Sequence, residues 1–125
     1  MTHGLAFLLS MLVEGAVGAL LGACLRERFN LSRLGASVRA GAAAVIGTGA
    51  THPALWVGFP GLMAWTGTWR SAAAFCVAGL SLVETLFYAA ALRGCWRWSL
   101  VLSTSANLLS FGIGMLLVSW LPKAP

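Results

Sequence analysis

Long apolar stretches alternate with short polar segments along the whole chain. Each stretch is about 22 residues long, and they are Gly4–Leu25, Ala40–Pro60, Ser71–Leu92 and Ser99–Leu121. A helix of about 20 residues, rising about 1.5 Å per residue, crosses the roughly 30 Å hydrocarbon layer of a bilayer. The pattern therefore predicts an all-α, polytopic membrane protein. Its four transmembrane helices would form two antiparallel hairpins within one domain, residues 1–125.

The composition agrees with a protein that lies almost entirely within lipid. Hydrophobic residues make up 59% of the chain and charged residues 9%, which is too apolar for a soluble domain of this size. The longest connection, Arg26 to Arg39, is too short for a separate extramembrane domain. The sequence has no HExxH, GxSxG or phosphate-binding glycine loop. We therefore expect a protein that is not an enzyme.

The arginines predict how the helices are oriented. The net charge is +5, and most of it comes from two connections, which contain Arg26, Arg28, Arg33, Arg39, Arg93 and Arg97. Connections rich in arginine stay on the cytoplasmic side of a membrane, so both chain termini are expected on the opposite side. The basic charge then reflects topology and contact with anionic lipid head groups, and we expect no nucleic-acid partner.

Ionisable side chains occur deep within the first two apolar stretches. Counting helix rise from the nearest arginine, Glu14 lies about 18 Å from Arg26, and His52 lies about 20 Å from Arg39. The two side chains are therefore at similar depth, and we expect them to pair. Ionisable groups at this depth usually face the bundle interior or a water-filled cavity, where they form functional sites.

The third and fourth stretches repeat this arrangement. Glu84 lies about 14 Å from Arg93, and Asn107 lies about 15 Å from Arg97, so these two are also expected to pair. Glu14, His52, Glu84 and Asn107 together predict an intramembrane site for protons or a cation. The alternative is that both acids are protonated and hydrogen-bonded, and only hold the helices together.

Further polar and small residues share helix faces with these four. Those expected to support the site are Thr51, Pro53, Ser81, Tyr88, Ser103 and Ser110. Pro53 cannot donate a backbone hydrogen bond, which predicts a free carbonyl at Gly49 and a kink in the second helix. Gly18 and Gly22 form a small-xxx-small pattern that allows close helix packing, and we also expect it to contribute to oligomer contacts.

His52 has other possible roles, as a metal ligand or as the axial ligand of a tetrapyrrole. A metal site needs three or four ligands, and the carboxyl and amide groups near His52 form a poor set for zinc. We expect no metal and no other cofactor, with a tetrapyrrole on His52 kept as an alternative. The favoured interpretation is an imidazole that hydrogen-bonds to an intramembrane acid.

Two motifs carry a resemblance to known proteins. Residues 50–56 read ATHPALW, and residues 103–114 read STSANLLSFGIG. The chain resembles a group of small four-span bacterial membrane proteins of uncharacterised function, which have THPxxW in the second span and SxxxNxxSFxxG in the fourth. That group often has an asparagine where this chain has Thr48, and a further acid where it has Val77. The resemblance implies a bacterial inner membrane location, and the arginine pattern then places both termini in the periplasm.

Two functions remain open at this stage. In the first, the chain is a small transport or channel-type protein, in which the two glutamates titrate while a proton or a cationic solute passes. In the second, it is a non-catalytic accessory subunit of a larger respiratory or photosynthetic membrane complex. Four short helices can barely enclose a path, so a homo-oligomer or a larger membrane complex is expected in either case.

Overall fold

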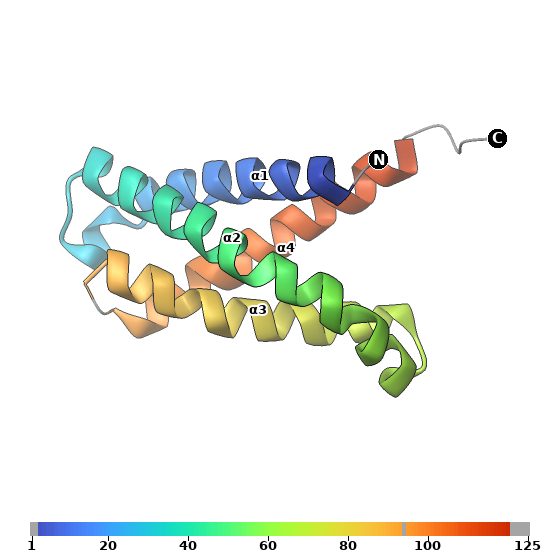
Figure 1. Ribbon diagram of the computed structural model, residues 1–125. Helices are drawn as coiled ribbons and strands as arrows, with labels where there is room; N and C mark the ends of the chain where they lie inside the picture. Colours follow the sequence, from blue (N-terminus) through green and yellow to red (C-terminus); the bar gives the residue numbers. More distant parts are fainter. Residues whose placement is uncertain (1–2, 94, 121–125) are drawn as a thin grey trace.

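The protein is all-helical in the part of the chain that the structure, a computed structural model, describes: residues 3–93 and 95–120 (Figure 1). The elements are α1 (His3–Cys24), the short 3₁₀ helix η1 (Arg26–Phe29), α2 (Arg33–Thr66), α3 (Trp69–Ala91) and α4 (Trp96–Trp120). Each of the four predicted helices is present. The ends of α1, α3 and α4 lie close to the predicted bounds.

Helix α2 is longer at both ends than the apolar pattern predicts. It begins after Ser32, whose side chain accepts a hydrogen bond from the backbone N–H of Gly35 at 3.1 Å. It ends at Gly67, where φ is 72°, a left-handed conformation that glycine adopts readily. The helix continues through Pro53 and Pro60 without a break. Pro53 has no N–H, so the carbonyl of Gly49 still lacks its usual donor.

Three helices in the described part of the chain are long and apolar enough to cross a membrane. Their spans are Phe7–Cys24, Trp69–Ala91 and Trp96–Leu116. Helix α2 has no window of comparable hydropathy, because its central turns consist mostly of glycine, alanine and threonine and include His52 and Pro53. Large apolar side chains are exposed on the outer surfaces of all four helices. These are the features of a helical membrane protein.

The four helices converge at one end of the molecule and separate at the other (Figure 1). Helix α2 packs between α1 and α3, and α4 contacts both α3 and α1. The end with the two arginine-bearing connections is the compact one. Away from it, the α2–α3 turn diverges from the start of α1 and the end of α4 (Figure 1).

Glycines on α1 let the backbones of α1 and α2 approach closely. A Cβ atom added at Gly22 would lie 2.5 Å from the Cβ of Ala40, and one added at Gly18 would lie 3.0 Å from the Cβ of Ala44. A larger residue at Gly22 would therefore force the helices apart, and one at Gly18 would crowd Ala44. The Gly18–Gly22 stripe is therefore covered by α2 of the same chain. A contribution of the stripe to oligomer contacts stays a prediction.

An apolar core closes the compact end of the bundle. It is formed by buried residues of η1, α2, α3 and α4, namely Phe29, Ala40, Ala43, Ala44, Tyr88, Leu92 and Leu102. Two arginine contacts brace the connections around it. Arg39 donates a hydrogen bond to the carbonyl of Ala91 at 3.4 Å, and the guanidinium of Arg28 lies 4.8 Å from the centre of the Trp98 ring.

Candidate functional site

Glu14 of α1 lies inside the bundle, with only 3% of its surface exposed. The Thr48 hydroxyl of α2 hydrogen-bonds to its carboxyl oxygen Oε2. We predicted that Glu14 would pair with His52, and this was wrong: Thr48, one helical turn earlier, takes that place. The close packing of α1 on α2 at Gly18 brings this earlier turn level with the carboxyl.

Glu84 of α3 is more enclosed, with 1% exposure. The Asn107 amide of α4 donates to its Oε2 at 2.6 Å, and the Thr51 hydroxyl of α2 lies 2.9 Å from its Oε1. The expected contact between Glu84 and Asn107 is therefore present. The carboxyls of Glu14 and Glu84 are also near enough to interact electrostatically. The structure thus gathers both acids into one polar cluster.

The two threonines of α2 face opposite neighbours, Thr48 toward α1 and Thr51 toward α3. Each hydroxyl also lies near a backbone carbonyl four residues earlier, at 2.8 Å from Ala44 and 3.0 Å from Gly47. A hydroxyl has a single hydrogen, so it can donate to only one of its two neighbours. When it donates to the carbonyl, the carboxyl must supply the proton for the other contact. The cluster can therefore accommodate neutral as well as ionised acids.

Further hydrogen bonds at the interface of α3 and α4 lie next to the contact between Glu84 and Asn107. The backbone carbonyl of Ser81 accepts hydrogen bonds from Ser103 at 2.9 Å and from Thr85 at 2.6 Å. Asn107 donates a second bond to the Ser103 carbonyl at 3.0 Å. Tyr88 is fully buried and interacts electrostatically with both glutamates. Among the described residues, its hydroxyl has no hydrogen-bond partner.

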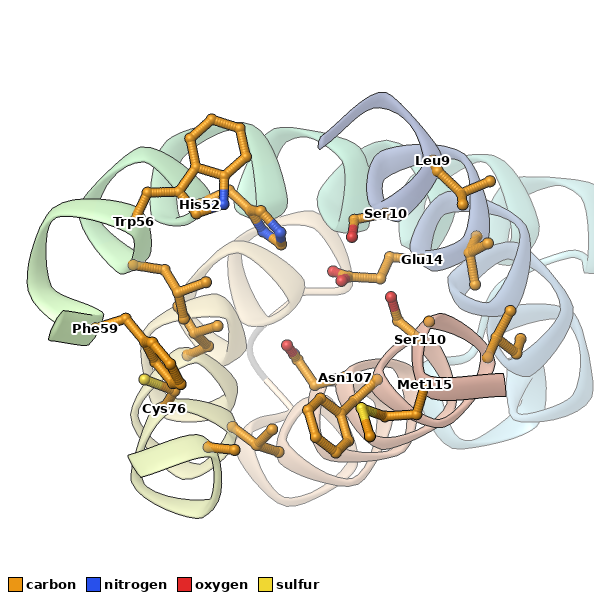
Figure 2. Close-up of a pocket in the computed structure, with 18 of the residues that line it drawn as sticks. Leu9, Ser10, Glu14, His52, Trp56, Phe59, Cys76, Asn107, Ser110 and Met115 are labelled. Carbon is orange, nitrogen blue, oxygen red and sulfur yellow. The ribbon is translucent and has the colours of Figure 1, made fainter. Parts of the chain in front are cut away.

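A cavity of about 590 Å³ lies between the four helices and reaches Glu14 (Figure 2). Its polar lining residues come from α1, α2 and α4 and are Ser10, Glu14, His52, Asn107 and Ser110. Most of the remaining lining is apolar, and it includes the aromatic residues Trp56, Phe59, Trp69 and Phe111. Glu84 is not among the lining residues, whereas Asn107, which donates a hydrogen bond to it, is.

His52 lies on the α2 side of the cavity, and its ring points toward Glu14 (Figure 2). Its ring centroid is 5.7 Å from that of Phe7 and 6.0 Å from that of Trp56. The Nδ1 atom is buried and has no hydrogen-bond partner within residues 3–93 and 95–120. Pro53, the next residue, is exposed and does not line the cavity.

Sequence reasoning missed two contributors, Ser10 and Thr48. Thr48 was noted only as the position where the resembling proteins often have asparagine. A signal was available, because Thr48 lies four residues before His52 and thus on the same face of α2. Hydroxyl and amide groups can both hydrogen-bond to a carboxyl, so either residue would suit this position beside Glu14.

Neither a metal centre nor a relative helps to interpret the site. The described residues contain no group of three or more His, Cys, Asp or Glu side chains that could hold a metal ion. A tetrapyrrole on His52 stays an untested prediction. No family model, curated protein or solved structure matches the chain. The interpretation of the site therefore rests on its own geometry.

Proposed function

We propose that this is a small multi-pass membrane protein of transport or channel type, which binds a proton or a cationic solute at Glu14. The observation that carries the proposal is a buried carboxyl group lining a cavity between all four helices. Ionisable groups inside a membrane are costly, and they mark ion and substrate pathways when they face a cavity. Ligand sites of membrane transporters lie at comparable depth, between helices.

The proposed topology has four spans in two hairpins. The arginine-bearing connections would face the cytoplasm of a bacterial cell, and both termini would face the periplasm. Helix α2 would cross the membrane despite its low hydropathy, because α1 and α3 cover much of its surface. The cavity would then be reached from the periplasmic side, since the apolar core closes the compact end.

The two glutamates would have different roles. Glu14 lines the cavity and would exchange its proton with water or solute there. Glu84 is held by Thr51 and Asn107 behind the cavity wall, and would fix Asn107 in position. Passage to the cytoplasm would require the layer containing Tyr88, Leu92 and Leu102 to open, within one copy or in an oligomer.

Flux through proteoliposomes tests this function. Glu14→Gln keeps the size of the side chain and its ability to hydrogen-bond, but removes its negative charge. Hydrogen bonds to charged groups contribute about 1.5–3 kcal/mol, so we expect pH-dependent proton or organic-cation flux to fall by at least about tenfold. Glu27→Gln is the matched control, because Glu27 is exposed in η1 and does not line the cavity. It should leave the flux unchanged.

The opposite result would favour the accessory-subunit interpretation. In that case, Glu14→Gln would fold normally and carry the same flux as the wild type, or the wild type would carry none. Purification in mild detergent would then recover the chain in a much larger assembly. A homo-oligomer that is active by itself contradicts the accessory role.

A further inference from the structure

Three of the polar residues on the cavity wall, Glu14, Asn107 and His52, can accept hydrogen bonds. Both hydrogens of the Asn107 amide are used, by Glu84 and by the Ser103 carbonyl, so only its oxygen is left for the cavity. The Nδ1 atom of His52 is buried without a hydrogen-bond partner, and it can accept a hydrogen bond when Nε2 carries the ring proton. Glu14, His52 and Asn107 come from three helices, and all three side chains line one space (Figure 2).

From this arrangement we propose that the cavity binds a primary ammonium compound with an apolar, aromatic body. A primary ammonium group has one positive charge and three N–H donors. Its three donors therefore match in number the acceptor groups of Glu14, Asn107 and His52. A quaternary ammonium group has the charge but no donor, so it gives these acceptors no hydrogen bond. The inference rests on the proposed function and names the class of solute.

The rest of the cavity determines the body of the ligand. Aromatic side chains also line it, including Trp56 and Phe59 of α2 and Phe111 of α4. Its volume, about 590 Å³, falls within the range of roughly 300–1,000 Å³ found for small-molecule sites. No lysine or arginine is among the described lining residues. An arylalkylamine fits this combination of one anionic group and apolar walls.

An inorganic cation fits the cavity less well. Calcium and magnesium need about six oxygen ligands in a compact shell. Glu14 is the only carboxylate among the described lining residues, and most of the other lining side chains are apolar. The cavity is also much larger than a coordination shell needs. The ammonium group of an organic amine needs fewer polar contacts, because its body is bound by the apolar walls.

Calorimetric titration of the purified full-length protein tests the proposal. The probes are phenethylamine, its N-trimethyl analogue and phenethyl alcohol, which share one body and differ in the head group. We expect phenethylamine to bind at least about tenfold more tightly than the trimethyl analogue, since three charged hydrogen bonds are lost in the latter. The alcohol should bind more weakly than phenethylamine. Equal or tighter binding of the trimethyl analogue overturns the proposal.

Two variants locate the head group. Glu14→Gln should lose phenethylamine binding by at least about tenfold, while Glu27→Gln keeps it. His52→Phe keeps a ring and removes both nitrogens, so it should weaken phenethylamine and leave the trimethyl analogue unchanged. An equal loss for both probes contradicts the role of His52. If either variant fails to fold, the comparison of probes on the wild type still decides the proposal.

The binding and flux experiments can each reject one proposal without rejecting the other. Selective amine binding without any flux in proteoliposomes keeps this inference and removes the transport function. Flux that depends on Glu14 but shows no preference for primary amines keeps the transport function and overturns this inference.

Discussion

The contact between Thr48 and Glu14 determines which protonation states the site can hold. The Thr48 hydroxyl has one hydrogen and two neighbours, the Glu14 carboxyl and the Ala44 carbonyl. With a neutral Glu14, every contact is complete, because the acid donates to Thr48 and Thr48 donates to Ala44. With an ionised Glu14, Thr48 must turn its hydrogen away from Ala44. We therefore expect Glu14 to be neutral when the cavity holds no cation.

Infrared spectroscopy of Thr48→Val checks this expectation. Valine keeps the shape of threonine and removes the oxygen that contacts Glu14. The carbonyl stretching band of a protonated Glu14, identified by its absence in Glu14→Gln, should move to higher frequency when this hydrogen bond is lost. Thr104→Val is the control, because Thr104 lines an outer groove between α3 and α4. If Glu14→Gln removes no carboxylic acid band at neutral pH, Glu14 is ionised and the expectation is wrong.

For individual residues, the sequence correctly predicted the partner of one of the two buried glutamates. Counting helix rise placed Glu84 level with Asn107, and the structure joins them. The same count placed Glu14 level with His52, whereas Thr48 makes the contact. Such a count fixes height only to within about one turn, 5.4 Å, because helices tilt and side chains lean along them. It therefore finds the cluster but cannot choose between neighbouring turns.

Among the elements, α2 differs most from what its sequence predicts. Apolar stretches located the other three helices closely, because lipid-facing helices need large apolar side chains along their length. The small residues of α2 instead serve helix packing, since they allow α1 to pack at van der Waals distance. Hydropathy therefore underestimates both the length of α2 and its suitability to span a membrane. Its ends follow instead from the Ser32 cap and the left-handed Gly67.

Cysteine labelling tests whether α2 crosses the membrane. Glu27→Cys and Arg70→Cys place single thiols at exposed positions near the two ends of α2, in a chain whose three native cysteines are replaced by alanine. In intact cells, an impermeant maleimide should label position 70 and should label position 27 only after permeabilisation. Labelling of both positions from the same side would show that α2 does not span the bilayer.

For the molecule as a whole, the cavity is the feature that the sequence could not predict. It exists because the helices separate away from the arginine-bearing connections, while an apolar core holds them together at the other end (Figure 1). Crossing angles depend on how ridges and grooves of side chains interlock along entire helices. Counting helix rise along single helices contains no information about crossing angles. It therefore predicted the polar residues of the site but not the cavity beside them.

The proposed binding reaction couples the cation to a proton. A neutral Glu14 that takes an ammonium group becomes a carboxylate, so its proton must leave. The groups that face Glu14 or share its cavity and can titrate are Glu84 and Tyr88 of α3, His52 of α2 and Cys76 of α3. Helix α4 adds Asn107 and Ser110, which do not titrate. Protons compete with the amine for Glu14, so amine affinity should rise as pH increases, until the amine itself loses its charge.

Counting the protons released when phenethylamine binds tests the central claim most directly. Calorimetry in buffers of different ionisation enthalpy gives this number without any assay of transport. The wild type and Glu27→Gln should release about one proton per amine bound at a pH where Glu14 is neutral. In Glu14→Gln, both binding and release should be lost. Amine binding to the wild type with no proton released at any pH would contradict the assignment of Glu14 as the exchanging acid.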